Sequence, residues 1–401
     1  MDMGAPHLDF EMWEGISAQN RFVILSAAKN PLRSIGLSPF KMARQQEDPI
    51  RGAQLNRRLL RGAITAAILS LAAIFTAHAA TDGKLKIYFI DVEGGQSTLF
   101  VTPEGHSLLV DAGWPGNNGR DADRIVAAAK DAGLSRIDYV LITHYHVDHT
   151  GGIPQLVSKI PVVAFLDHGP NSELDHGITE KDYADYQAEL AKNHEKVIHA
   201  KPGEILPIEG IHATVISSDG KLIAHPLPGA GQPTSGCATA PTPEADQTEN
   251  SHSLGIEIDF GKLRILVLGD LTKDKERPLV CPVNKIGHID ILVVSHHGWE
   301  QSSSPVFVDA LHARVAIMDN GAKKGGSTPV LQTFKASPGL ETLWQLHYSE
   351  EGGDANNTAA EYIANPKGPD AGYGLKLVAS KDGNFEVTNP RTGQTKHYAA
   401  R

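Results

Sequence analysis

Residues 137–152, with the sequence IDYVLITHYHVDHTGG, decide the fold assignment. The first seven residues are a largely apolar run typical of a buried β-strand, and four ligand-type side chains follow within six positions. Alternate residues on an extended turn can point the same way, so His144 and His146 can hold one metal ion, and Asp148 and His149 are placed to hold a second. Imidazole and carboxylate suit zinc, and also manganese or iron. A chance cluster on a solvated loop is the alternative, which this density of ligand-type residues disfavours.

Two later strand ends carry the same kinds of side chain. An apolar run at residues 264–268 leads to Asp270, which we interpret as a carboxylate that bridges two metals, because an acid at the end of a buried strand is costly unless it is paired or bound to a cation. Its alternative role is an N-cap for the next helix. A second run at residues 289–294 leads to His296 and His297. One of these is expected to be a ligand of the second metal and the other a supporting group or proton donor, and the sequence leaves the order open.

The remaining pattern predicts an α/β fold. Strands come in two groups, each followed by helices, which indicates two packed sheets flanked by helices. Residues 219–250 are rich in Pro, Gly, Thr and Ala and predict a long surface loop or insertion. The expected strands are residues 85–92, 97–101, 106–110, 137–143, 162–166, 197–200, 204–206, 212–217, 254–260, 264–268, 289–294, 315–319 and a C-terminal hairpin of 373–379 and 384–387. The expected helices are residues 121–132, 153–159, 180–193 and 328–336.

The N-terminal region has the three parts of a secretory signal peptide. Arginines at 57, 58 and 61 precede an apolar stretch at residues 63–77, and Ala77-His78-Ala79 gives the small-x-small pattern of a cleavage site. We therefore predict a signal peptide at residues 57–80, cleaved near Ala79, and a periplasmic or secreted protein without a stable membrane span after cleavage. An uncleaved anchor is the alternative, although the run is short and rich in Ala. Residues 1–56 are interpreted as a non-structural leader or a mis-assigned start, which leaves 81–401 for the folded domain.

Composition narrows the function classes. The chain contains 19 histidines, and neutral imidazole is the commonest metal ligand. Residues 1–80 hold nine basic and six acidic side chains, so the remainder has 28 basic and 41 acidic residues. That excess of acid argues against tight binding of a nucleic-acid backbone. Cys237 and Cys281 either pair, as two cysteines of an exported protein often do, or remain free thiols.

The motifs together resemble the metallo-β-lactamase superfamily, and in particular the soluble hydrolase domain of the bacterial competence DNA-uptake (ComEC-type) protein. The similarity covers about residues 85 to 365. It implies an αββα sandwich of two mixed β-sheets, a pair of Zn²⁺ ions (with Mn²⁺ or Fe as alternatives), and a role for Asp111, and also for Asp91, in orienting the histidine loop. The motifs that carry the resemblance are Asp91-Val-Glu-Gly-Gly-Gln96, Asp111-Ala112-Gly113, the HxHxDH segment, Asn250-Ser-His-Ser-Leu254, Gly269-Asp270, His296-His297-Gly298 and Ser302-Ser303-Ser304.

The chain departs from the family pattern at two points. Gln96 stands where the subfamily has an acid. The histidine expected upstream of the bridging Asp is replaced by Asn250, as in the subfamily. His252 and His168 are candidate substitutes, and each also reads as an ordinary polar residue. The first metal is therefore expected to be weakly held, or bound through Asn and water.

The resemblance implies a hydrolase in which metal-bound hydroxide attacks a phosphoryl or carbonyl centre. Asp148 would hold the second metal and orient the nucleophile, and His296 or His297 would protonate the leaving group. The subfamily favours phosphodiesters or phosphoesters, while a lactone or β-lactam-type acyl substrate and a non-catalytic, metal-stabilised binding protein are the alternatives. A DNA-processing factor is a third, which the acidic charge weighs against. The Gly/Asn-rich run Gly352-Gly353-Asp354-Ala355-Asn356-Asn357 is expected to form a substrate-side loop. Upstream of it, His347 and Lys323 are either contacts for an anionic substrate or solvated loop residues.

Overall fold

The computed structural model describes residues 83–174 and 177–401. The predicted leader and signal peptide, residues 1–56 and 57–80, lie outside these described residues. Within them, no helix combines the length and the apolar character needed to cross a membrane.

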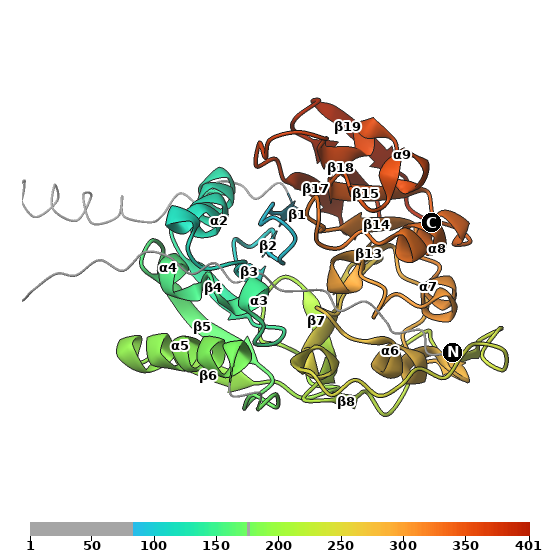
Figure 1. Ribbon diagram of the computed structural model, residues 1–401, viewed down its shortest axis with the longest axis horizontal. Coiled ribbons are helices and arrows are strands. Elements are labelled where there is room, and N and C mark those ends of the chain that lie inside the picture. The colour runs from blue at the N-terminus through green and yellow to red at the C-terminus, as the bar shows by residue number, and fades with distance from the viewer. Residues whose placement is uncertain (1–82, 175–176) are drawn as a thin grey trace, which may run out of the picture. The chain divides into compact units, whose positions relative to one another are not determined.

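The first of two large β-sheets combines antiparallel and parallel strands (Figure 1). Its antiparallel half runs from β19 to β3, and β3 to β6 are parallel. In spatial order the strands are β19 (Gln394–Tyr398), β18 (Phe385–Asn389), β17 (Leu375–Ser380), β1 (Lys84–Phe89), β2 (Thr98–Val101), β3 (Ser107–Val110), β4 (Ile137–Leu141), β5 (Val162–Asp167) and β6 (Lys196–His199).

The second sheet is also mixed. Strands β11, β13, β14, β15 and β16 are parallel, and β11, β10, β7 and β8 pair antiparallel. In spatial order its strands are β16 (Ile363–Asn365), β15 (Thr342–His347), β14 (Val315–Met318), β13 (Ile291–Val293), β11 (Leu263–Val267), β10 (Gly255–Phe260), β7 (His212–Ser218) and β8 (Lys221–Leu222).

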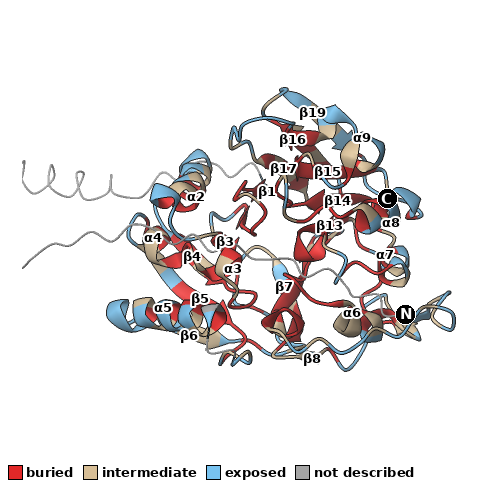
Figure 2. Cartoon of the chain, viewed as in Figure 1, coloured by how far each residue is buried: buried red, intermediate tan, exposed pale blue. Residues whose placement is uncertain are grey.

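The side-chain pattern of the strands explains why the sheets stack. In β17, Leu375, Leu377 and Ala379 are buried and alternate with half-buried residues, so one face of the strand joins the core between the sheets. The parallel strand β14 is buried along its whole length, as expected where both faces of a sheet are covered. Figure 2 shows the strands as the buried layers, with exposed surface on the helices outside them.

Helices cover both outer faces. A second core lies between the first sheet and α2, α4 and α5, and a third lies between the second sheet and α6, α7 and α8. The predicted αββα sandwich of two mixed sheets is therefore confirmed. The helices are α2 (Arg120–Asp131), α3 (Val147–Thr150), α4 (Ile153–Val157), α5 (Ile178–Asn193), α6 (Lys273–Val280), α7 (Pro305–Leu311), α8 (Thr328–Ala336) and α9 (Gly353–Asn356), with short 3-10 turns η2 (Asn117–Gly119), η3 (Glu249–His252), η4 (Ser295–Gly298) and η5 (Ala360–Tyr362).

The structure differs from the expected elements at three places. No strand was expected at residues 344–347, which belong to β15, all of which is buried. Polar residues in this strand obscure the apolar pattern of a buried strand in the sequence. They form hydrogen bonds inside the fold: the Gln345 Nε2 group donates to Asn357 Oδ1 at 2.9 Å. Residues 204–206 form only an isolated bridge, Ile205 to Thr214, instead of a strand. The C-terminal hairpin gains a third strand, β19, whose side chains carry too few apolar residues to signal a strand.

The loop at residues 219–250 is anchored at several points. Its short strand β9 (Gln232–Pro233) pairs with β12 (Val283–Asn284), and Arg277 donates to the Cys237 carbonyl at 2.8 Å. Cys237 and Cys281 are joined by a disulfide across a sequence separation of 44 residues, which resolves the two alternatives left by the sequence. The bond ties this loop to the end of α6.

We expect the double substitution Cys237→Ala/Cys281→Ala to lower the free energy of unfolding by about 4 kcal/mol, because the bond closes a long loop and restricts the unfolded chain. Urea unfolding of the oxidised protein and of the variant measures the difference. A change below about 1 kcal/mol would show that the loop is held by its other contacts alone.

Candidate metal centre

Strand ends from both sheets deliver the ligand-type side chains to one edge of the sandwich. The histidine motif follows β4 of the first sheet and continues into α3, while Asp270 follows β11 and His297 follows β13 of the second sheet. Two backbone hydrogen bonds join these ends: Leu254 N donates to Thr143 O at 2.7 Å, and His296 N donates to Gly269 O at 3.1 Å. The ends are therefore held together by the main chain, independently of any ligand.

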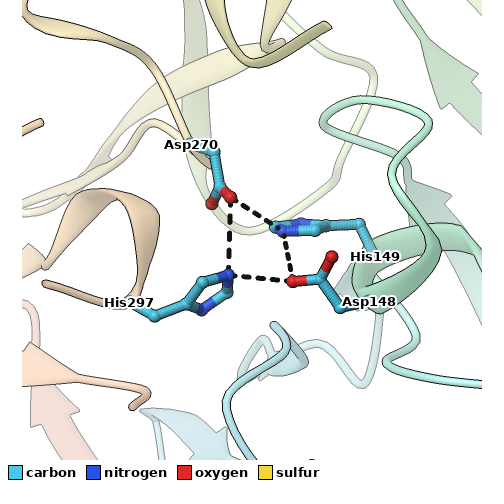
Figure 3. A group of neighbouring side chains, drawn as sticks. All are labelled: Asp148, His149, Asp270 and His297. Atoms are coloured by element: carbon cyan, nitrogen blue, oxygen red, sulfur yellow. Dashed lines mark ion pairs between the residues drawn. The ribbon is translucent and has the colours of Figure 1, made fainter. Parts of the chain in front are cut away.

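Four buried side chains converge there, as Figure 3 shows: Asp148, His149, Asp270 and His297. One ligand atom of each lies within 4.8 Å of the others. Asp270 Oδ2 is 3.3 Å from His149 Nε2 and 3.4 Å from His297 Nε2. Asp148 Oδ2 closes the ring at 3.3 Å and 3.1 Å from the same two nitrogens. Two carboxylates and two imidazoles in this arrangement surround a point at which a cation can be bound.

The donor atoms themselves fit a divalent cation. His149 Nε2, His297 Nε2 and Asp270 Oδ1 are buried and make no hydrogen bond within the described part of the chain. Buried polar atoms are costly without a partner, and a metal ion between the two imidazoles would supply one for both Nε2 atoms. Neutral imidazole and carboxylate are ligands for zinc and for other first-row metals, so the residues present leave the identity of the metal open.

The charges in this group oppose one another strongly. Burial would raise the pKa of Asp270, but the imidazoles of His149 and His297 hold it well below its usual value. For His297, burial works in the other direction, yet the carboxylates of Asp270 and Asp148 outweigh it and raise its pKa to about 10. In the absence of a metal the group is thus stabilised by protons on the imidazoles, and a cation that binds there must displace them.

Asp111 holds the histidine loop, as the family resemblance implied. Its Oδ2 accepts from His149 Nδ1 at 2.7 Å and from the Thr143 hydroxyl at 2.7 Å, and its Oδ1 accepts from Thr143 N at 2.8 Å. These bonds fix the ring so that Nε2 faces the other three side chains. Asp111 itself has φ 59°, an unfavourable backbone conformation that the surrounding bonds maintain.

Unusual backbone geometry also aims the later ligands. His296 and His297 have φ 55° and 53°, which is uncommon for residues with a Cβ and marks local strain at this turn. Gly269, just before Asp270, has φ +57°, and a Cβ there would lie 2.7 Å from the Thr143 Cβ. Only glycine lets the Asp270 turn approach the histidine loop this closely.

The other two motif histidines form a neighbouring pair. His144 Nε2 and His146 Nδ1 are 3.1 Å apart, and His146 Nε2 is 3.0 Å from Glu173 Oε2. His144 Nε2 also lies 3.9 Å from Asp270 Oδ2. His296 Nε2 is 3.5 Å from Asp270 Oδ2 but is outside the four-residue group, so the structure places His297 rather than His296 among the ligand-type atoms.

The candidates for a third histidine are not among the four converging side chains. His252 Nδ1 lies 3.5 Å from Asp219 Oδ1, and His168 Nε2 lies 2.9 Å from Glu249 Oε2. Asn250 is buried in η3, and its Oδ1 has no hydrogen-bond partner among the described residues. The alternative N-cap role of Asp270 is excluded, because α6 begins at Lys273 with Thr272 as its N-cap.

Of the two adjacent lysines, only Lys323 was a candidate from the sequence, and Lys324 is the one whose side chain reaches the group. Lys323 is exposed, whereas the neighbouring Lys324 donates to Asp148 Oδ2 and, at 2.7 Å, to the Gly94 carbonyl. Its ammonium also lies 5.3 Å from the Trp114 ring centroid and 5.4 Å from that of Trp299. The Lys-Lys-Gly-Gly run is visible in the sequence, but only the folded loop shows which side chain turns inward.

His347 and Asp91 also act differently from the expectation. The buried His347 Nε2 is 2.7 Å from Asp91 Oδ1, so it supports the fold rather than a substrate, and Asp91 does not orient the histidine loop. Glu93 and Asp370 join these two in a second group of clustered ligand-type atoms. Arg124 already pairs with two of its carboxylates, Asp91 at 3.0 Å and Asp370.

Comparisons with known proteins agree with this geometry. Residues 91–234 match the family model of the metallo-β-lactamase superfamily. The chain is 24% identical over 234 residues to "Recombination protein 2" of Haemophilus influenzae, which covers 58% of this chain and 24% of that protein. It is 34% identical over 91 residues to "Hydroxyacylglutathione hydrolase" of Aliivibrio salmonicida, covering 22% of this chain and 32% of the relative.

Among solved structures, the Rm3 metallo-β-lactamase aligns with a TM-score of 0.31 at 14% identity over 66% of this chain and 78% of that one. The diiron β-hydroxylase CmlA from Streptomyces venezuelae aligns with a TM-score of 0.34 at 16% identity over 58% of this chain and 44% of that one. The curated relatives are much longer than their match, since the chain spans about a quarter to a third of their length.

The predicted resemblance to this superfamily and to the competence-type proteins is confirmed over the matched residues. A hydrolase is among the relatives, and the substrate is left open. Divalent-metal binding is supported by the family and by the converging group, without a choice of metal. The individual ligand and catalytic roles stay predictions.

We expect Asp270→Asn to weaken Zn²⁺ binding by more than about a hundredfold, because the charged carboxylate contacts both imidazoles of the group. Competition with a chromophoric chelator gives the affinity. His252→Gln is the matched control, since its side chain lies outside the group, and it is expected to bind as the wild type does. Equal losses in the two variants would contradict this assignment of ligands.

A second prediction concerns the carboxylate of Glu249, beside the histidine loop. Burial would raise its pKa, but hydrogen bonds from His168 and Ser172 lower it to about 2, against 4.5 when unfolded. Its contribution to stability, about 3 kcal/mol, is therefore present above pH 4.5 and is lost as the pH falls towards 2.

Glu249→Gln should lower the free energy of unfolding at neutral pH by about that amount, ~3 kcal/mol, and flatten its decline in acid. Urea unfolding between pH 3 and 7 measures both. Glu244→Gln, at an exposed position of the same loop, is the control, and identical pH profiles for the two variants would argue against a stabilising role of Glu249.

Proposed function

We propose that this chain, whose residues 91–234 form a metallo-β-lactamase superfamily domain, is an exported metal-dependent hydrolase of phosphodiesters or phosphoesters. The observation that carries the proposal is the buried group of Asp148, His149, Asp270 and His297, in which the Nε2 atoms of both histidines make no hydrogen bond within the described residues. A divalent cation held there would lower the pKa of a bound water towards neutrality and so supply a nucleophile.

The protein residues around this point divide the remaining tasks. Asp111 and Thr143 hold His149 in its orientation, and the rigid turn after β13 holds His297. The His296 ring is adjacent but outside the group, and burial lowers its pKa to about 4. It is therefore a neutral imidazole at neutral pH, and we propose that its ring N–H donates a hydrogen bond to the leaving group.

Local charge favours an anionic substrate. The Lys324 ammonium lies at the group, and a bound cation adds to the positive charge there, although the chain as a whole is acidic. We therefore propose a small phosphoester rather than a long nucleic acid, whose backbone would meet the acidic surface.

Export is supported by the disulfide between Cys237 and Cys281, because such bonds persist in oxidising compartments. The predicted signal peptide at residues 57–80 places the protein in the periplasm or outside the cell. The acidic net charge is compatible with either location.

Acyl hydrolysis is the second candidate function. The 34% identity to a hydroxyacylglutathione hydrolase over 91 residues favours it, because the same nucleophile attacks acyl centres. The non-catalytic binding protein is the remaining alternative, and substrate turnover separates it from both.

We expect the protein loaded with Zn²⁺ or Mn²⁺ to hydrolyse bis(p-nitrophenyl) phosphate or p-nitrophenyl phosphate faster than p-nitrophenyl acetate, a lactone or S-lactoylglutathione. Release of p-nitrophenol, or of thiol, measures each rate. Asp270→Asn should lose turnover, and His252→Gln should keep it. Preference for the acyl substrates would move the assignment to the second function, and a loaded protein without turnover on any of them would favour the binding protein.

A further inference from the structure

Lys324 places a fixed positive charge directly on the candidate metal group. Its ammonium donates to Asp148 Oδ2, and that same oxygen faces His149 Nε2 at 3.3 Å and His297 Nε2 at 3.1 Å. The side chain is about one-fifth exposed, at 22%. The Lys324 ammonium therefore lies at the border between the buried group and solvent, where a substrate must approach.

The loop that carries Lys324 is locked to the same elements as the ligands. Gly326 N donates to the His297 carbonyl at 2.9 Å, and a Cβ on Gly325 would lie 2.2 Å from that oxygen. On the other side, the ammonium is bound by the Gly94 carbonyl at 2.7 Å. The loop backbone cannot move away from the group without breaking these contacts.

Two indole rings also contact the Lys324 ammonium. Trp114 and Trp299 lie with their ring centroids 5.3 and 5.4 Å from Lys324 Nζ, at the distance of a cation–π contact. They come from different sheets' loops, and both keep the charge in place without neutralising it. A surface lysine that served only to keep the protein in solution would not need contacts with two aromatic rings.

The number of metal-ligand side chains in the centre is sufficient for one cation but not clearly for two. Within residues 83–174 and 177–401, only one fully buried group of four clustered ligand-type residues is present. The neighbouring pair, His144 and His146, has Asn250 at the position of the family's third histidine. The centre thus offers a full set of donors for one cation and a reduced set for a second.

We propose that Lys324 supplies the second positive charge of this centre, so that the protein binds one divalent cation per chain and the ammonium, beside Asp148, holds the substrate's anionic oxygen together with that cation. This rests on the proposed hydrolase function. A lysine ammonium is a compact point charge suited to a phosphoryl oxygen, and a positive charge aimed at the reacting oxygens stabilises the charge that develops there.

The competing explanation is that Lys324 only supports Asp148. It predicts the opposite change in metal affinity when Lys324 is removed. If Lys324 only orients Asp148 as a ligand, its removal weakens metal binding, as the loss of such partners generally does. If it acts as the second cation, it repels the bound metal, and its removal strengthens metal binding.

The test measures Zn²⁺ stoichiometry and affinity in the full chain, without any substrate. Metal analysis after dialysis should give one equivalent for the wild type. Lys324→Met, which keeps the length of the side chain, should bind Zn²⁺ about tenfold more tightly in competition with a chromophoric chelator. Lys323→Met is the matched control at the exposed neighbour and should leave the affinity unchanged, and Lys324→Arg should remain close to the wild type.

Two equivalents of tightly bound Zn²⁺ in the wild type would overturn the proposal, and so would unchanged or weaker affinity in a folded Lys324→Met. Thermal unfolding of the metal-free variants checks folding, and the wild-type stoichiometry tests the proposal even if Lys324→Met fails to fold. Because these readouts need no turnover, absence of hydrolysis would defeat the proposed function without deciding the role of Lys324.

Discussion

Two carboxylates, Asp148 and Asp270, are buried at the meeting point of the two sheets. Each is almost completely removed from solvent, and an isolated buried carboxylate costs several kcal/mol. The fold answers with imidazoles from two directions and with the ammonium of Lys324. Such an arrangement adds little stability of its own. Its presence is better explained by a cation that these groups hold.

The sandwich brings the two carboxylates together because each sheet contributes one of them. Asp148 lies in α3, which follows β4, and Asp270 lies in the turn after β11. The apolar core between the sheets fixes the distance between these strands, so a cavity in that core would be felt at the site as well as in stability. The strained turns at Asp111 and His297 then set the final directions of the side chains.

Much of the candidate site was predictable from the sequence, because functional side chains often follow the ends of buried strands. The HxHxDH segment, Asp270 and the histidine pair each follow an apolar run, so their types and positions were visible without a structure. Lys324 was not, because periodicity says nothing about which of two adjacent loop lysines turns inward. The pairing of His347 with Asp91, across 256 residues of sequence, has no local signal either. Strand β15 was missed for a related reason: its buried polar side chains find partners only in the completed fold.

Two features that looked unrelated in the sequence acquire a common physical meaning in the folded chain. Asn250 in place of a histidine removes a donor from one side of the centre, while Lys324 adds a charge on the other side, at Asp148. The missing donor at Asn250 weakens the binding of a second divalent cation, and the ammonium of Lys324 repels such a cation. Both features therefore favour a centre with a single metal ion. A carboxylate that is already paired with an ammonium also gives less negative charge to the metal it binds. That metal then attracts electrons from its other ligands more strongly, which favours ionisation of a bound water at neutral pH.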